Sequence, residues 1–321
     1  MVMTTRSRNH HFLAKFLLER FRPNGSKMLY YRRSTGWREG DSGPKRLGCE
    51  THLYSPGVID LGGRAPTDDG AEQWLAKSID TPAAGPIRRL SDGADVNSLS
   101  IAERRAIANF VGILDMRSPL VRDLVSPAMG AGVSAATDRR TTRKQLLTTR
   151  GIRVTLGEVS RIRRMMNIDC QGKPGWLHYM QSEYPNASRN VLARNWSLVH
   201  AAGGSEFVTS DLGMVKSIAG FQQPVSWEMG DIAGRVEWLV PLSPKAALLV
   251  TPRAVASALS TDPASMAAIN RQFAADAREF IYARSSVAPS VFDALPKQPS
   301  DPRETRAMLV RMAVEARRSA V

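Results

Sequence analysis

Cysteine is scarce in this chain of 321 residues, which contains only Cys49 and Cys170. Neither belongs to a CxxC pair, and the start of the chain lacks the basic, apolar and small-residue segments of a secretory signal, so we expect neither a disulfide framework nor secretion. No window of about 18 apolar residues is free of charge or proline, and the sequence therefore predicts no membrane span. These absences predict a cytoplasmic protein without a membrane partner.

The short motifs of common enzymes are also missing. "GAGVSAA" (130–136) has glycines but neither the GK[ST] of a P-loop nor a preceding strand, so it predicts a linker. No G-x-S-x-G elbow surrounds Ser210, which argues against a serine hydrolase. Cys49 and His52 in "CETH" could form half of a zinc site, but no second pair completes it.

Positive charge, in contrast, is abundant and uneven. The net charge is +14 at pH 7. Residues 1–50 hold eleven Lys and Arg against four Asp and Glu, and residues 137–165 hold nine against two, while the remainder is balanced. Two basic segments in a balanced chain are typical of a surface that binds a polyanion through phosphate contacts. Six basic residues of the second segment are the candidate nucleic-acid contacts: Arg139, Arg140, Arg143, Lys144, Arg161 and Arg164. A solvated basic face that binds nothing is the alternative.

The order of the predicted elements indicates an α+β fold. Apolar residues at helical spacing predict a first helix directly after His10 and His11, and further helices near 71–79 and 100–116, the last opened by a capping box of Ser100 and Glu103. A short strand is expected at 27–33 and a loop at 38–48. Hairpins at 195–211 and 236–252 predict an antiparallel sheet in the second half, and closing helices follow at 263–282 and from 301.

These elements predict one α+β domain over residues 1–287, with a helical N-terminal and middle part. A flexible basic stretch is expected around 130–153 within that domain. Residues 288–321 are expected to form a linker and a C-terminal amphipathic helix.

Seven segments together resemble one protein family. They are "HHFLAKFLLERF", "LYYRRSTG", "GPKRLGCETHLYS", "EQWL", "FVTSD", "VPLSP" and "INRQFAADAREFIYARS". In this order, over roughly residues 9–287, they resemble the bacterial family of domain of unknown function 4238, whose pattern has His-His-x-x-Pro, Thr-Ser-Asp-Asn-Pro and Pro-Leu-Ser-Pro. The resemblance implies a shared fold and no assigned activity.

The chain departs from that family pattern at two places. Ala14 stands where the pattern has proline after the histidine pair, and alanine is also compatible with a first helical turn. Leu212 and Gly213 stand where the pattern has Asn-Pro after Asp211. The second change removes a side-chain donor and acceptor beside Asp211 and would alter a site there.

The adjacent histidines allow two interpretations. In the functional one, His10 and His11 precede a helix whose free N–H groups attract anions, and Asp211 at a strand end orients an imidazole or holds a divalent metal. In the structural one, His11 packs within the fold, His10 lies at the surface, and Asp211 caps the turn after its strand.

Two functions follow from these interpretations. The first is a metal-assisted phosphodiester hydrolase acting on nucleic acid, with His10, His11 and Asp211 as the catalytic residues and as ligands of a divalent metal. The alternative is a non-catalytic module that binds nucleic acid or an acidic partner, in phage or stress response. The sequence predicts no particular oligomeric state.

Overall fold

The structure is a computed structural model of the chain. It describes residues 9–23, 26–51, 53–54, 70–119, 121–123, 155–158, 173–218, 221–224 and 236–293. The chain divides into two compact units. The first comprises the described residues of 1–53, 69–118 and 183–299, and the second those of 54–68, 119–182 and 300–321. All elements discussed below belong to the first unit, except for the first ten residues of the helix α8 (Lys173–Leu192).

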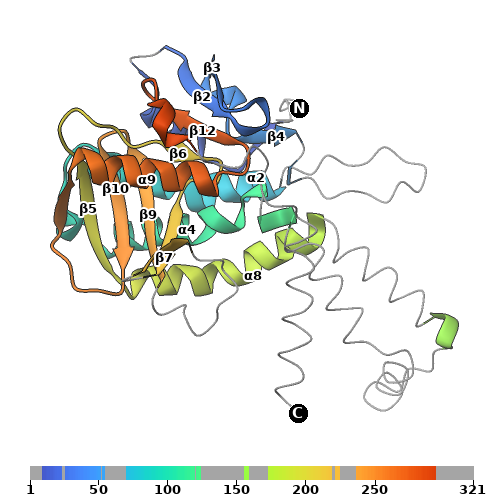
Figure 1. Cartoon of the computed structure of the whole chain (residues 1–321). Coiled ribbons are helices and arrows are strands. Elements are labelled where there is room, and N and C mark those ends of the chain that lie inside the picture. Colours follow the sequence, from blue (N-terminus) through green and yellow to red (C-terminus); the bar gives the residue numbers. More distant parts are fainter. Residues whose placement is uncertain are drawn as a thin grey trace, which may run out of the picture. The chain divides into compact units, whose positions relative to one another are not determined.

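A six-stranded sheet forms the centre of the first unit (Figure 1). Its strand order is β11-β5-β10-β9-β7-β8. The strands are β5 (Asn195–Ala201), β7 (Val215–Ile218), β8 (Phe221–Pro224), β9 (Val236–Ser243), β10 (Ala246–Thr251) and β11 (Ala258–Thr261). Every pair is antiparallel except β11–β5, which is parallel, so the sheet is mixed.

Helices cover both faces of this sheet, with α9 (Pro263–Asp276) crossing one face and α3 (Thr81–Ser91) and α4 (Ile101–Met116) on the other (Figure 1). Val199 and Ala247 pack with Met266 of α9, while their neighbours Leu198 and Leu248 are buried too. Because side chains alternate along a strand, burial of successive residues requires cover on both faces. The continuous apolar sequence of β10 is consistent with this cover on both faces.

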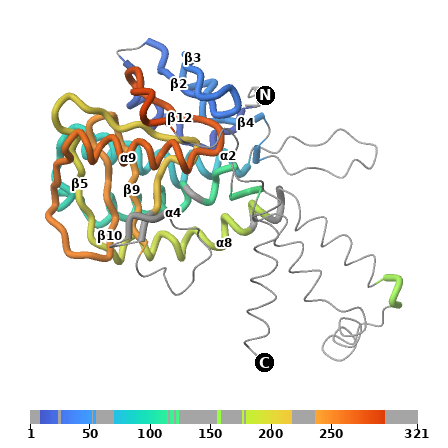
Figure 2. Tube along the Cα trace, in the orientation of Figure 1, coloured from blue at the N-terminus to red at the C-terminus, as the bar shows by residue number. Residues whose placement is uncertain are grey.

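A second sheet has four strands in the order β3-β2-β12-β6. They are β2 (Met28–Arg32), β3 (Arg38–Ser42), β6 (Thr209–Ser210) and β12 (Phe280–Ala283). Figure 2 shows the N-terminal strands in blue beside β12 in red. Tyr31, Ile281 and Val291 form the core of this sheet together with Phe273 of α9, so α9 packs against both sheets.

The histidine pair lies on a short strand rather than at the start of a helix. β1 (Asn9–His11) pairs antiparallel with β4 (Cys49–Thr51), and α1 (Lys15–Arg20) follows after Ala14. The buried side of α1 consists of Leu17 and Leu18, and the Ala14 carbonyl accepts the first helical hydrogen bonds. The predicted first helix is therefore confirmed, but it begins later than expected.

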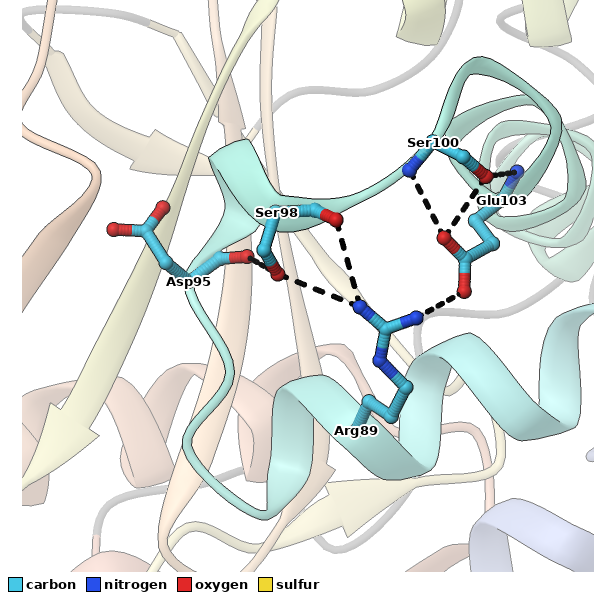
Figure 3. A network of polar contacts seen from close by, with 5 residues as sticks. All are labelled: Arg89, Asp95, Ser98, Ser100 and Glu103. Carbon is cyan, nitrogen blue, oxygen red and sulfur yellow. Dashed lines mark hydrogen bonds and ion pairs between the residues drawn. The ribbon is translucent and has the colours of Figure 1, made fainter.

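The middle of the first unit is helical. α2 (Gly70–Trp74) continues through a π-helical stretch, η3 (Leu75–Asp80), into α3. The predicted capping box at α4 is present: the Ser100 hydroxyl accepts from the Glu103 N–H at 3.2 Å, and Glu103 accepts from the Ser100 N–H at 2.9 Å. Figure 3 shows that Glu103 also binds Arg89, whose guanidinium reaches back to Ser98. One network thus fixes the turn between α3 and α4.

The α+β fold is confirmed, as is the hairpin over 236–252, which is β9–β10. The hairpin over 195–211 is wrong, because β5 pairs with β10 and β11 while β6 joins the other sheet. The sheets also take strands from the N-terminal part, including β3 within the predicted loop at 38–48. Phe280 lies on β12 rather than on α9.

The start of the predicted linker is packed rather than extended. Within it, η6 (Pro289–Val291) buries Val291 against the four-stranded sheet, and Phe292 stacks on Trp37. The predicted C-terminal helix and the basic stretch at 130–153 lie outside the described residues. None of the helices in the described part of the chain has the length and apolarity needed to cross a membrane.

Candidate functional site

His10 and His11 point to opposite sides of β1. His10 is completely buried opposite Glu50, and His11 is partly exposed opposite Cys49. The structural interpretation had placed His10 at the surface, and this placement is wrong. Alternation along the strand explains the difference, because one of two adjacent strand residues must face the interior. His11 is therefore the histidine of the pair that solvent can reach.

Glu72, in the first turn of α2, lies against His11. Its Oε1 accepts a hydrogen bond from the His11 backbone N–H at 3.3 Å and is 3.9 Å from the imidazole Nδ1. The side chains of His11 and Glu72 are 18% and 22% exposed, so both are mostly shielded from water without being sealed off. A carboxylate in this position can orient the imidazole.

A partly buried ion pair stands close to this histidine. Arg117, directly after α4, has a completely buried side chain and donates from Nη1 to Asp80 Oδ1 at 2.9 Å. Burial raises the pKa of Asp80, whereas the charge and hydrogen bond of Arg117 lower it; Glu72 raises it and His11 lowers it. His11, Glu72, Asp80 and Arg117 thus form one electrostatic group, called the His11 cluster below.

The ion pair in the His11 cluster has no simple stability rationale. Desolvation of two charges offsets much of their attraction, and an apolar pair of similar volume is often at least as stable. Breaking such a pair by removing one partner, however, costs about 3–5 kcal/mol, because the other charge stays buried. Buried charges beside a partly exposed histidine are typical of sites that perform chemistry.

Sequence reasoning missed three members of the His11 cluster: Glu72, Asp80 and Arg117. Glu72 was assigned only to a short helix, and Asp80 and Arg117 were not singled out. Arg117 carried no usable signal, because an arginine at the C-terminal end of a helix is common whether or not it is buried. Their common location was not readable from spacing, since 37 positions separate Asp80 from Arg117.

Asp211 has a different role from the one predicted. The residue is only 4% exposed. Its carboxylate accepts hydrogen bonds from the backbone N–H groups of Arg278 at 2.9 Å, Glu279 at 2.6 Å and Phe280 at 3.1 Å. Burial raises the pKa of Asp211, and these three N–H donors act in the opposite direction. The carboxylate therefore joins the end of β6 to the segment before β12.

The turn after Asp211 explains the departure from Asn-Pro. The Gly213 N–H donates to the Ser210 carbonyl at 2.9 Å, and Gly213 has a φ of 72°. Proline fixes φ near −65° and cannot adopt this conformation. A Cβ at Gly213 would also lie 2.7 Å from the Leu13 side chain. The Leu212-Gly213 pair thus has a turn geometry that an Asn-Pro pair could not share.

The predicted metal centre is not formed. Among the residues that the structure describes, no group of three or more His, Cys, Asp or Glu side chains could hold a metal ion. The trio of His10, His11 and Asp211 is therefore wrong as a metal site, because Asp211 is committed to three backbone donors. Catalysis by His10 or His11 stays a prediction.

The other candidates fall largely outside the described residues. This applies to all six predicted nucleic-acid contacts, Arg139, Arg140, Arg143, Lys144, Arg161 and Arg164, and to His52. Cys49 is a free, partly buried thiol whose Sγ donates to the Lys45 carbonyl at 3.8 Å. Burial, followed by the charge of Glu72, raises the pKa of this thiol and disfavours the reactive thiolate.

Comparison with known proteins identifies one family. The family described as "Protein of unknown function (DUF4238)" matches residues 9–287, which include both sheets and the His11 cluster. No curated protein and no solved structure matches the chain.

Proposed function

The chain belongs to this family of proteins of unknown function, and we propose that it hydrolyses phosphodiester bonds in nucleic acid, with His11 as the proton-transferring residue. The observation that carries the proposal is the position of Glu72 against a partly exposed His11, 3.9 Å from its Nδ1. The net charge of +14 supports a polyanionic substrate.

The chemistry assigned to His11 is general acid–base catalysis. Hydrolysis adds water across a phosphorus–oxygen bond: one proton leaves the attacking water, and the departing oxygen gains one. Histidine performs both transfers near neutral pH. Glu72 orients the imidazole and stabilises the imidazolium that exists between the two transfers, as a carboxylate does in other imidazole-based sites.

Asp80 and Arg117 act as positioning residues in this proposal. Arg117 holds Asp80, and the charges of Glu72 and His11 both act on Asp80. A fixed, partly buried ion pair next to the imidazole keeps the local field constant while the proton moves.

The test is a cleavage assay on fluorescently labelled single-stranded and duplex DNA and RNA, with and without divalent cations. His11→Ala should remove at least 99% of the activity, in line with the roughly 100-fold or larger contribution of acid–base catalysis. Glu72→Gln should lower kcat less and should shift its pH dependence. His200→Ala, on β5 of the six-stranded sheet, is the matched control and should cleave like the wild type.

A second candidate function is non-catalytic binding of nucleic acid. It is favoured by Asp211, the only predicted catalytic carboxylate, whose oxygens are all engaged by the backbone. Under this function the wild type would retain labelled nucleic acid but leave it intact in every metal condition. Equal cleavage by the wild type and His11→Ala, with the same pH profile, would contradict catalysis at His11.

A further inference from the structure

We propose that α1 and the elements beside it form a binding surface for single-stranded nucleic acid. In this arrangement, phosphate groups occupy a basic pocket next to the β2–β3 hairpin, and a base stacks on Phe16 in an adjoining pocket. The identity of the ligand as nucleic acid rests on the proposed function, whereas the anion-binding property rests on the two pockets themselves.

The first pocket has a volume of about 510 Å³. Its charged lining residues are Glu19, Arg22, Lys27, Asp41, Lys45 and Arg46. They come from the end of α1, the two strands β2 and β3 with their flanking residues, and the 3₁₀ turn η2 (Pro44–Arg46). Four cations and two carboxylates give this pocket a net charge of +2, which favours a phosphate-bearing ligand.

Ion pairs leave part of this positive charge available. Arg22 pairs with Glu19 at 3.3 Å, and Lys27 pairs with Asp41 at 3.2 Å. Lys45 and Arg46 are exposed and take part in none of the ion pairs within the described residues. An incoming phosphate can therefore bind these two side chains without first displacing a carboxylate from them.

The backbone beneath these two cations is held in place. Pro44 is buried at the first position of η2, and the Arg46 N–H donates to the Gly43 carbonyl at 3.0 Å. The next residue, Leu47, is only 7% exposed. Lys45 and Arg46 are thus flexible side chains on a fixed turn, so that binding orders the side chains alone and costs less entropy than ordering a loop.

A second pocket, of about 460 Å³, adjoins the first along α1. Glu19 lines both pockets, and the second is also lined by Phe16, Arg20 and Arg88. Arg20 pairs with Asp92, while Arg88 is exposed and belongs to none of the ion pairs among the described residues. The second pocket therefore combines an aromatic ring with an available guanidinium.

Phe16 decides which form of nucleic acid the surface suits. Its ring packs at 52° against Phe110 with centroids 5.2 Å apart, which fixes its orientation while it lines the pocket. A base can stack on such a ring only when it is not paired and stacked within a duplex. Phosphate contacts at Lys45, Arg46 and Arg88 alone would not distinguish the two forms.

The experiment compares charge reversals of equal size by fluorescence anisotropy of labelled single-stranded and duplex oligonucleotides in the full-length protein. Lys45→Glu combined with Arg46→Glu should weaken binding at least tenfold. This pair should also reduce the slope of log K against log salt by about 1.4, since each single-strand phosphate contact contributes roughly 0.7. The matched control combines Arg105→Glu with Arg271→Glu, two exposed arginines that line neither pocket, and should bind within threefold of the wild type.

Phe16→Leu and Phe16→Ala test the stacking part. Both should weaken single-strand binding at least threefold and leave duplex binding unchanged, with the leucine variant preserving packing against Phe110 if the alanine variant unfolds. Equal binding by the pocket variant and the charge-matched control would overturn the proposal, as would equal effects of Phe16→Leu on single strands and duplexes. If the wild type binds nucleic acid without cleaving it, and the pocket variant loses this binding, the result would support this surface while contradicting the proposed hydrolysis.

Discussion

Replacement of Asp211 by alanine should destabilise the protein substantially, although the sequence pattern placed this residue in a catalytic trio. Its carboxylate accepts three backbone N–H groups, those of Arg278, Glu279 and Phe280, at distances between 2.6 and 3.1 Å. Alanine would leave these donors without the acceptor. A catalytic residue at the surface would behave oppositely, because its removal normally changes stability by less than about 0.5 kcal/mol.

The size of the effect follows from the number of donors. A buried donor left unsatisfied costs about 1–3 kcal/mol, so three donors give a range of roughly 3–9 kcal/mol. The lower end applies, because water can enter the space left by the carboxylate and because the variant no longer buries a charge. We therefore expect Asp211→Ala to lower the free energy of unfolding by about 3–4 kcal/mol, a large part of the roughly 5–15 kcal/mol of a typical domain.

Urea unfolding followed by circular dichroism measures this loss. Asp211→Asn, which keeps one carbonyl acceptor but directs an amide N–H₂ toward backbone donors, should lie between alanine and the wild type. Asp293→Ala is the control, since Asp293 is exposed, and should change the unfolding free energy by less than about 0.5 kcal/mol. A loss below 1 kcal/mol for Asp211→Ala would refute the structural role.

Three further predictions concern stability. Burial raises the pKa of Asp80 above its usual 3.8. The stability that Asp80 contributes is therefore complete below that pH and is lost as the pH rises through the folded-state pKa. Asp80→Asn should flatten this decline in urea unfolding measured across pH, and an unchanged pH dependence would contradict the prediction. Ser100→Ala removes the acceptor of the Glu103 N–H and should lower the free energy of unfolding by about 1 kcal/mol. This loss should be measurable as a lower Tm, and an unchanged Tm would show that the cap contributes nothing to stability. Gly213→Ala should lower the Tm, because Gly213 has a φ of 72° and an added Cβ would lie too close to the Leu13 side chain. Gly213→Pro should lower the Tm further, and a proline variant as stable as the wild type would disprove the turn geometry.

Local signals in the sequence predicted local structure well. Ser100 with Glu103 marks the start of α4, and Asp262, which accepts from the Ser265 N–H, marks the start of α9, because each cap is made by residues within three positions of one another. The hairpin β9–β10 was equally readable, since its turn joins two apolar runs directly. In each of these cases the whole interaction lies within a short stretch of sequence.

Interactions between distant segments were not readable in this way. The helical pattern predicts a helix over 263–282, but the N–H groups of Arg278, Glu279 and Phe280 bind Asp211, and the chain turns into β12. The assembly of the His11 cluster likewise depends on tertiary packing. A residue's helical or strand preference is a weak signal that such long-range partners override.

The position of β12 constrains how the protein can fold during synthesis. This strand lies between β2 and β6, and it pairs Phe280 with Arg32 across almost 250 residues of sequence. Until β12 has left the ribosome, β2 can pair only with β3, and its other edge stays open to unwanted partners. Because closing so long a loop precedes the stabilising contacts, the four-stranded sheet should form late and slowly. Any chain that ends before residue 280 would keep the β2–β3 hairpin without the strand that joins it to β6.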